Sequence, residues 1–182
     1  FAIYGEGIDV IDVSNKNAPS LITTFNYPGS GTHNGIISAD GRHMFVGDEI
    51  GVSGNHTRVF DISDINNVSI VANIVVNPSA VAHNCYLRGD LLFIAHYTEG
   101  CRVIDVSDPV NPVEVAYYDT WLPATFGYDG MWTAYPLLPS GKIIASDRST
   151  GLWVFTMEDT DTDGIFDVTD NCVDDPNPTQ TD

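Results

Sequence analysis

The chain has 182 residues, enough for one ordinary domain, and 43% of them are hydrophobic, so a buried core is expected. The net charge is -18 and no basic patch is present, which argues against nucleic acid and anionic membranes as partners. No run of about 18 apolar residues occurs, so the sequence predicts no transmembrane segment. The charge is uneven: residues 159–182 contain eight Asp and no Lys or Arg, which makes a cation the natural partner of this tail.

A short apolar stretch recurs along the chain. Residues 103–108 (Val-Ile-Asp-Val-Ser-Asp) match residues 10–15 and 59–64, and residues 154–159 form a worn fourth copy. The third positions of the copies are 12, 61, 105 and 156, so the steps are 49, 44 and 51 residues. A repeat of roughly 40–50 residues indicates a solenoid, a propeller or an array. The first three copies end in Ser-Asp or Ser-Asn, which predicts a strand that enters a turn closed by the Asp or Asn side chain.

One repeat divides fully into strands, which are expected at residues 83–88, 91–97, 101–106 and 113–118. Four antiparallel strands joined by tight turns form one propeller blade. The preceding repeat matches this pattern, whereas the first repeat lacks its first strand and the last lacks a fourth. The predicted fold is therefore all-β: a fragment of a β-propeller over residues 1–157, with two whole and two partial four-stranded antiparallel blades. We expect the chain to be a piece of a longer protein.

Several motifs resemble known families. The repeated stretch resembles the LVIVD repeat of bacterial surface β-propellers. Further motifs resemble the choice-of-anchor B family, and these are Thr32-His33-Asn34-Gly35, Asp48-Glu49, Ala82-His83-Asn84, His96-Tyr97 and Gly130-Met131-Trp132 through Pro139-Ser140-Gly141. The resemblance covers nearly all of residues 1–157. It implies a secreted protein with a propeller and a variable C-terminal anchor, but no settled activity. The worn fourth copy departs from the pattern, because Thr156 replaces Asp.

The acidic tail, residues 158–182, contains a twelve-residue loop with oxygen ligands at alternate positions. Positions 1, 3, 5, 9 and 12 are Asp159, Asp161, Asp163, Asp167 and Asp170. Position 6 is a glycine, and position 7, Ile165, offers its backbone carbonyl. This is EF-hand spacing, in which the glycine makes a sharp turn and the oxygens converge on one hard cation, so calcium is the predicted cofactor. The alternative is a disordered acidic linker.

The continuation of this loop resembles a thrombospondin type 3 repeat, on the residues Asp170-Asn171-Cys172, Asn177, Gln180 and Asp182. In that family calcium loops follow one another, and a cysteine pairs with a cysteine of a neighbouring repeat. The resemblance therefore implies a disulfide partner for Cys172 in a neighbouring repeat.

Imidazoles and carboxylates fall near the ends of the first and second strands of the repeats. They are His33, Asp48, Glu49, His83, His96 and Asp147. The first strand of each blade lines the central channel of a propeller, and a two-residue hairpin would place His83 opposite His96. Gathered at one channel mouth, such groups hold a transition metal or perform acid–base chemistry. The other interpretation is structural, with the His-Asn pairs capping strands and bonding neighbouring loops.

The sequence also predicts the state of the first two cysteines and allows two interpretations of the larger aromatic residues. Hairpin pairing is expected to place Cys85 opposite Ile94 and Cys101 opposite Tyr97, too far apart for a disulfide, so both are predicted to be packed free thiols. The larger aromatic residues either form a sugar-binding platform or wedge between blades, and they are Tyr117, Tyr118, Trp121, Trp132, Tyr135 and Trp153.

Two functions follow from these patterns. The first is a secreted or cell-surface binding or adhesion module that binds an extracellular protein or glycan, with a calcium-stiffened spacer at its C-terminus. The second is a metal-assisted hydrolase or lyase, whose site at the channel mouth uses the histidines and acidic residues named above.

Overall fold

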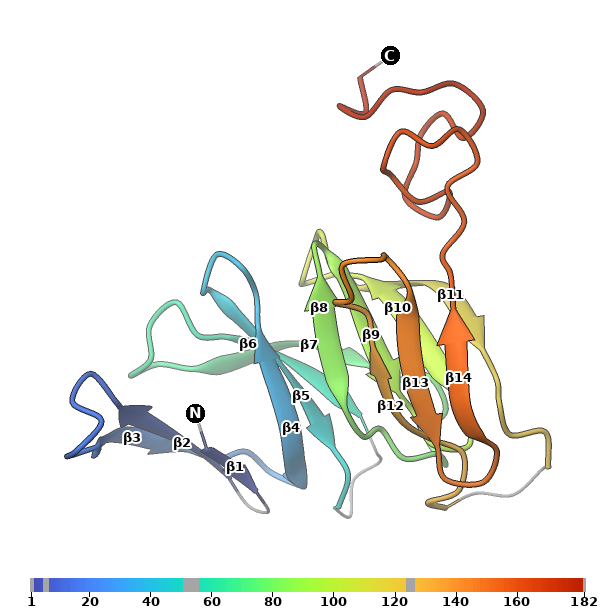
Figure 1. Cartoon of the computed structure of the whole chain (residues 1–182). Coiled ribbons are helices and arrows are strands. Elements are labelled where there is room, and N and C mark those ends of the chain that lie inside the picture. The colour runs from blue at the N-terminus through green and yellow to red at the C-terminus, as the bar shows by residue number, and fades with distance from the viewer. Residues whose placement is uncertain (1, 5–6, 51–55, 124–126, 182) are drawn as a thin grey trace.

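The computed structural model describes residues 2–4, 7–50, 56–123 and 127–181, and the strands in these residues form four antiparallel sheets that stand side by side (Figure 1). The first sheet contains β1 (Ala2–Tyr4), β2 (Gly7–Asp12) and β3 (Ser20–Phe25). The second contains β4 (Thr32–Ile37), β5 (His43–Asp48), β6 (Thr57–Asp61) and β7 (Ser69–Ile74). The third contains β8 (Cys85–Arg88), β9 (Leu91–Ala95), β10 (Cys101–Asp105) and β11 (Val113–Tyr118). The fourth contains β12 (Met131–Tyr135), β13 (Ile143–Asp147) and β14 (Gly151–Phe155).

These sheets are propeller blades, as the sequence predicts. Consecutive strands pair with one another in each sheet, and β4, β8 and β12, the first strands of three blades, contact one another in turn. The two central sheets have four strands and the two outer ones three among the described residues. In the same residues no helix is long and apolar enough to cross a membrane.

The repeated stretch ends in turns closed by side chains, which confirms the turn prediction. In the second blade Asp61 Oδ1 accepts the backbone N–H of Ser63 at 2.9 Å, and Asp64 Oδ1 accepts that of Asn66 at 3.0 Å. The third blade repeats the first of these bonds, from Ser107 to Asp105. Each Asp thus fixes the chain reversal after the third strand of its blade, because its carboxylate replaces a backbone acceptor.

The apolar core lies between the sheets. Met44 faces the first sheet and Phe45, its neighbour in β5, faces the third. In β9, Leu92 faces the second sheet and Phe93 faces the fourth. Side chains alternate between the two faces of a strand, so a strand buried on both faces is apolar throughout. Burying each of these large side chains contributes about 1.5–3 kcal/mol, and this packing fixes the order of the blades.

The first strands begin with a bulge that the sequence analysis missed. The backbone N–H of His83 donates to Ala95 O, while the N–H of Ala95 donates to Asn84 O, so two residues lie opposite one. The predicted pairing of His83 with His96 is therefore wrong. The next hairpin also differs, because Cys101 pairs with Ala95 and not with Tyr97.

The conclusion about the first two cysteines is confirmed, and so is the pairing of Cys85 with Ile94, whereas the predicted pairing of Cys101 with Tyr97 is wrong. Cys85 and Cys101 are free and buried. They lie on opposite sides of β9, and their side chains enter different interblade cores, which prevents a disulfide. Desolvation raises the pKa of each thiol to about 12, so both are inert packing groups.

After β14 the chain leaves the blades and forms an irregular segment at one end of the molecule (Figure 1). Phe166 ties this segment to the body, because it packs against the core between the third and fourth blades. The guanidinium carbon of Arg88 lies 4.6 Å from the centre of its ring. A cation over an aromatic face contributes about 0.5–1 kcal/mol at an exposed site.

Close approach of the third and fourth blades requires a glycine at position 130. Its φ is +87°, and an added Cβ would lie 2.4 Å from Tyr97 O. Gly41 has a similar φ of +71° with no atom within 4 Å, so it is a matched control. We expect Gly41→Ala to lower the free energy of unfolding by about 1–2 kcal/mol, the cost of a left-handed residue. Gly130→Ala should lower it more, because the backbone of Tyr97 must also move. Urea unfolding midpoints measure both losses, and equal losses would contradict the close approach.

Candidate functional site

The bulges of three successive blades bring three rings together. His33, His83 and Trp132 occupy equivalent positions, each being the extra residue at the start of a first strand. The ring centres of His33 and His83 are 4.5 Å apart, and those of His83 and Trp132 are 4.3 Å apart. The extra residue of a bulge interrupts the alternation of side chains between the two faces of a strand. The three rings therefore point toward the edge where the first strands of the blades meet.

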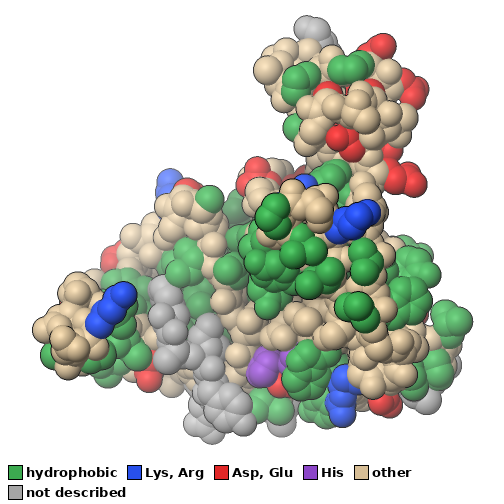
Figure 2. All heavy atoms as spheres, in the orientation of Figure 1, with side chains coloured by type: hydrophobic (Ala, Val, Ile, Leu, Met, Phe, Trp, Pro, Cys, Tyr) green, Lys and Arg blue, Asp and Glu red, His purple; other side chains and the backbone are tan. Residues whose placement is uncertain are grey.

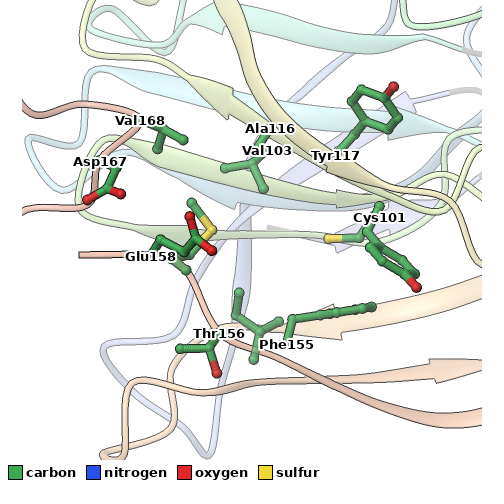
Figure 3. Close-up of a pocket in the computed structure, with 12 residues that line it drawn as sticks. Cys101, Val103, Ala116, Tyr117, Phe155, Thr156, Glu158, Asp167 and Val168 are labelled. Atoms are coloured by element: carbon green, nitrogen blue, oxygen red, sulfur yellow. The ribbon is translucent and has the colours of Figure 1, made fainter. Parts of the chain in front are cut away.

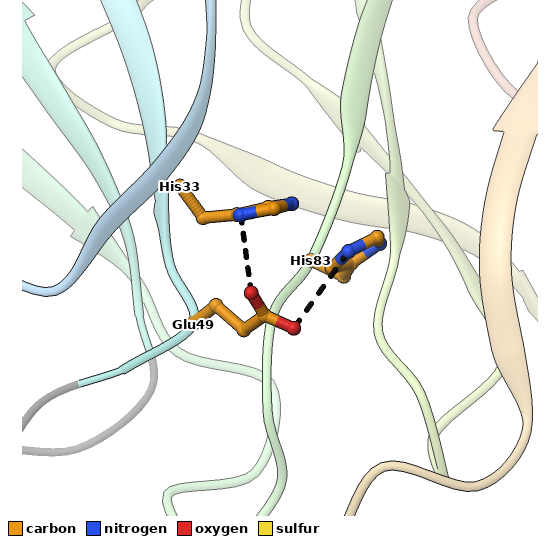
Figure 4. Close-up of side chains that lie close together, drawn as sticks. All are labelled: His33, Glu49 and His83. Carbon is orange, nitrogen blue, oxygen red and sulfur yellow. Dashed lines mark ion pairs between the residues drawn. The ribbon is translucent and has the colours of Figure 1, made fainter. Parts of the chain in front are cut away.

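Glu49 follows β5 and reaches both histidines (Figure 4). Its Oε2 lies 3.1 Å from His33 Nδ1, and its Oε1 lies 3.7 Å from His83 Nε2. One ligand atom from each of the three residues lies within 4.8 Å of the other two. The sequence analysis had named all three residues as site candidates, and the structure brings them together.

The ring of His83 is held in one orientation. It is 1% exposed, and its Nδ1 lies 2.5 Å from the carbonyl oxygen of Trp132. A carbonyl oxygen only accepts, so Nδ1 carries the proton and Nε2 presents its lone pair toward Glu49. Nε2 is buried and has no hydrogen-bond partner within the part of the chain that the structure describes. Desolvation lowers the pKa of His83, which keeps the ring neutral at pH 7.

Tyr97 supports Glu49 from the third blade. Its hydroxyl donates to Glu49 Oε1 at 2.6 Å, and desolvation together with this bond raises the pKa of Tyr97, so the hydroxyl stays protonated. Tyr97 adopts a φ of +38°, a left-handed conformation that is strained for a tyrosine. Such strain persists only where neighbouring structure holds it, and it gathers at functional sites. The sequence analysis named Tyr97 only as part of a family motif.

Three other predicted site residues do not join this group. Asp48 ends β5, Asp147 ends β13 and His96 directly follows β9, each one residue before Glu49 or its counterpart in another blade. None of the three belongs to the cluster of His33, Glu49 and His83, which we call the channel group.

Each of these three side chains has a structural environment of its own. Asp48 accepts hydrogen bonds from Arg58 Nε at 2.7 Å and from Gly31 N at 3.1 Å. Asp147 accepts from the hydroxyl of Thr120 and from the backbone N–H of Ser149 and Thr150. Desolvation opposes its ionisation, but these bonds dominate and lower its pKa. His96 is buried, and no bond to either ring nitrogen occurs among the described residues.

The acidic loop forms a second cluster of ligand atoms. The carboxylates of Asp159, Asp161 and Asp163 lie within 4.8 Å of one another. Asp159 Oδ1, Asp161 Oδ2 and Asp170 Oδ2 are buried without a hydrogen-bond partner in the described chain. Desolvation and repulsion from the carboxylates of the other three raise the pKa of Asp161. Gly164 has a φ of +96°, which makes the sharp turn at position 6.

Two predicted ligands of the loop, Asp167 and Asp170, make hydrogen bonds outside the cluster of carboxylates. Asp167 turns to Thr160, accepting its backbone N–H and its hydroxyl at 2.7 Å each. Asp170 directs Oδ1 to Cys172 N and to the amide of Gln180, which leaves only Oδ2 for the loop. The backbone of Asn177 donates to Asp163 Oδ2, so the residues after the loop fold back onto it. Cys172 is free in this structure.

An apolar cavity of about 280 Å³ lies between the third and fourth blades and the tail. Figure 3 shows Cys101 and Val103 on one side, Phe155 on the other, and the carboxylates of Glu158 and Asp167 at one end. The ring of Tyr118 packs 5.5 Å from Trp153 beside this cavity. Trp153 packs against the core between the third and fourth blades, as the wedge interpretation expects, whereas Tyr117, Tyr118 and Trp132 are exposed, and the ring of Trp132 lies tilted against His83.

The C-terminal segment and the body of the molecule differ in the side chains on their surface (Figure 2). Acidic side chains crowd the surface of the C-terminal segment, whereas few histidine atoms are visible on the body of the molecule. The side chain of His33 is 27% exposed and that of Glu49 is 17% exposed. Solvent therefore reaches the channel group on the side of His33.

Comparison with known proteins supports the repeat assignment. Residues 2–27 and 81–120 match the LVIVD repeat family. These segments are LVIVD repeats of a β-propeller. No curated protein matches the chain.

Solved structures share the fold at low sequence identity. A protein from Lactobacillus plantarum aligns with a TM-score of 0.66 and 16% identity, over 88% of this chain and 49% of its own. A periplasmic gluconolactonase from Pseudomonas aeruginosa gives 0.63 and 17%, over 84% and 44%. A putative 6-phosphogluconolactonase from Bacteroides fragilis gives 0.60 and 17%, over 82% and 44%. The chain therefore spans about half the length of the solved structures that it matches.

The burial of His96 predicts a pH-dependent stability. Desolvation lowers its pKa to about 4 in the folded state, against about 6.5 when unfolded. Below about pH 6.5 only the unfolded chain takes up this proton, so the free energy of unfolding should fall as the pH drops toward 4. The limiting slope is about 1.4 kcal/mol per pH unit for one proton. Urea unfolding of the wild type and of His96→Leu at pH 7, 6 and 5 measures how the free energy of unfolding depends on pH. The same pH dependence in both proteins would show that His96 is not its source.

Proposed function

We propose that this chain is part of a secreted or cell-surface binding or adhesion module of the choice-of-anchor B type. The LVIVD propeller is its ligand-binding body, and residues 158–182 are a thrombospondin type 3-like spacer that calcium orders. The observation that carries this proposal is the acidic loop, where three buried carboxylate oxygens lack a hydrogen-bond partner among the described residues. Buried carboxylate oxygens without donors are costly, and a bound cation offsets that cost.

The residues of the loop fit calcium better than other biological cations. Asp159, Asp161, Asp163 and Asp170 supply hard carboxylate oxygens, and Ile165 supplies a backbone carbonyl at position 7. Asp167 at position 9, where a ligand often acts through a water molecule, keeps its bonds to Thr160. Magnesium demands a smaller octahedral site and retains its water, so it competes poorly.

The partner of the propeller is proposed to be an extracellular protein or glycan. The net charge of -18 disfavours nucleic acid and anionic lipid, and extracellular modules with this calcium chemistry work where calcium is abundant. Weak loops, with dissociation constants of about 10⁻⁴–10⁻³ M, are filled under such conditions.

A second candidate function is a metal-assisted hydrolase or lyase. The group of His33, Glu49 and His83 favours it, because imidazoles and a carboxylate converge at the inner ends of two blades. One of the similar solved proteins is described as a periplasmic gluconolactonase and another as a putative 6-phosphogluconolactonase. Asp48, His96 and Asp147 have no place in this catalytic set. Hydrolysis of glucono-δ-lactone by the wild type, lost in His83→Gln, would support this candidate, and no hydrolysis by the wild type would exclude that substrate.

Calcium titration tests the spacer. The wild-type chain should bind one calcium ion with a dissociation constant of about 10⁻⁴–10⁻³ M, because Asp170 is shorter than the usual glutamate at position 12. Asp161→Asn/Asp163→Asn should abolish binding, because it removes two of the clustered charges. Isothermal titration calorimetry measures the affinity, and limited proteolysis measures the ordering of residues 158–182.

The matched control is Asp174→Asn/Asp175→Asn, which removes the same charge from exposed residues outside the loop. Its calcium affinity should stay within about twofold of the wild type. At free calcium of about 100 times the dissociation constant, binding stabilises the ordered form of the loop over its disordered form by roughly 2.7 kcal/mol. Equal calcium uptake by the two double variants would eliminate the proposed site.

A further inference from the structure

We propose that His33, Glu49 and His83 form a binding site for one divalent transition metal of the zinc class, with His83 Nε2 as its anchoring ligand. The inference does not depend on the calcium loop. It deepens the second candidate function by naming the metal and its ligand atoms, and metal binding is measurable whether or not the protein turns over a substrate.

The first argument is the state of His83. Its Nδ1–H donates to Trp132 O, and its Nε2 is buried and without a hydrogen-bond partner in the described residues. A buried nitrogen lone pair that points at a carboxylate gains nothing from that carboxylate, because both are acceptors. Metal-ligating histidines adopt this same arrangement, donating one N–H to a backbone carbonyl and binding the ion through the other nitrogen.

The second argument is the spacing of the ligand atoms. Zinc ligands lie about 2.0–2.2 Å from the ion, so two of them in a tetrahedron are about 3.4 Å apart. The observed separations are 3.1 Å from His33 Nδ1 to Glu49 Oε2 and 3.7 Å from His83 Nε2 to Glu49 Oε1, and one ligand atom from each of the three residues lies within 4.8 Å of the other two. The rings of the two histidines are tilted by 24°, so His33 must rotate for both lone pairs to meet at one ion. Its 27% side-chain exposure leaves room for that rotation.

The third argument is the support around the three ligands. The Tyr97 hydroxyl holds Glu49 Oε1 at 2.6 Å, and Trp132 O holds His83. Ligands fixed by outer hydrogen bonds bind a metal more tightly, by about 10–100-fold for each such partner. Arg148, whose guanidinium carbon lies 5.7 Å from the centre of the Trp132 ring, carries a positive charge near the group and opposes the charge of a bound ion.

The donor set selects the metal. Two imidazoles and one carboxylate suit zinc and its neighbours in the first transition row, whereas calcium and magnesium prefer oxygen ligands. Three protein ligands leave a fourth position open to water or to a ligand in the channel, which is the pattern of catalytic zinc sites rather than structural ones.

The test is a titration of the whole chain with Zn²⁺ by calorimetry, with calcium at about 100 times the dissociation constant of the acidic loop, so that the loop is saturated. Visible absorption of added Co²⁺ reports imidazole coordination independently. We expect one Zn²⁺ per chain, bound at least about 10-fold more weakly by Glu49→Gln and by His83→Gln. The change at buried His83 can prevent folding. His33→Gln changes a partly exposed ligand and should also weaken zinc binding, so it tests the site in that case.

Two controls separate this site from other metal-binding groups. His43→Gln removes a histidine outside the group, and Asp161→Asn/Asp163→Asn removes the acidic cluster, so both should bind zinc as the wild type does. The proposal is overturned if the wild type binds no zinc, if the His33 and Glu49 variants keep wild-type affinity, or if zinc uptake follows the acidic loop. Zinc binding without lactone hydrolysis would leave the metal site standing and remove only that activity.

Discussion

Burial of both faces of the inner sheets is the constraint on which the rest of the structure depends. A sheet such as β8–β11 has apolar side chains on its two faces, with Leu92 on one and Phe93 on the other, so it requires a neighbour on each side. This packing sets the blades side by side and brings β4, β8 and β12 into contact at their inner edge. The channel group exists because of that contact, since no single blade contains it.

The repeats preserve geometry while their side chains diverge. The bulge position holds His33, His83 and Trp132 in three blades, and the same backbone distortion directs each ring inward. The positions that directly follow Asp48, His96 and Asp147 hold Glu49, Tyr97 and Arg148, an acid, a phenol and a cation. A repeated scaffold thus builds an asymmetric site, in which each blade contributes a different chemical group.

Two groups of potential cation ligands occupy different electrostatic settings. The acidic loop holds half-buried, mutually repelling carboxylates, which favours a hard cation held by charge. The channel group contains one carboxylate and two imidazoles, of which His83 is buried and neutral, so affinity there depends on lone-pair geometry. The large negative net charge raises the local concentration of cations at both.

The sequence by itself determined the fold class, the strands and the turns. A repeat that ends in Asp-Val-Ser-Asp encodes its structure locally, because the carboxylate bonds a backbone two residues away. The loop at Asp159–Asp170 was visible for the same reason, since all its candidate ligands lie within twelve residues. The residues His33, Glu49 and His83 were also identified as candidates, but together with Asp48, His96 and Asp147, which do not join them.

Only the tertiary structure separated these two sets. A bulge shifts the register by one residue, and one residue decides which face of a strand a side chain occupies. The bulge depends on contacts between blades, where Gly47 and Gly130 let neighbouring backbones approach, and no local sequence signal encodes that approach. The burial of His83, its bond to Trp132 and the strained Tyr97 likewise join residues of different blades, so folding alone decided them.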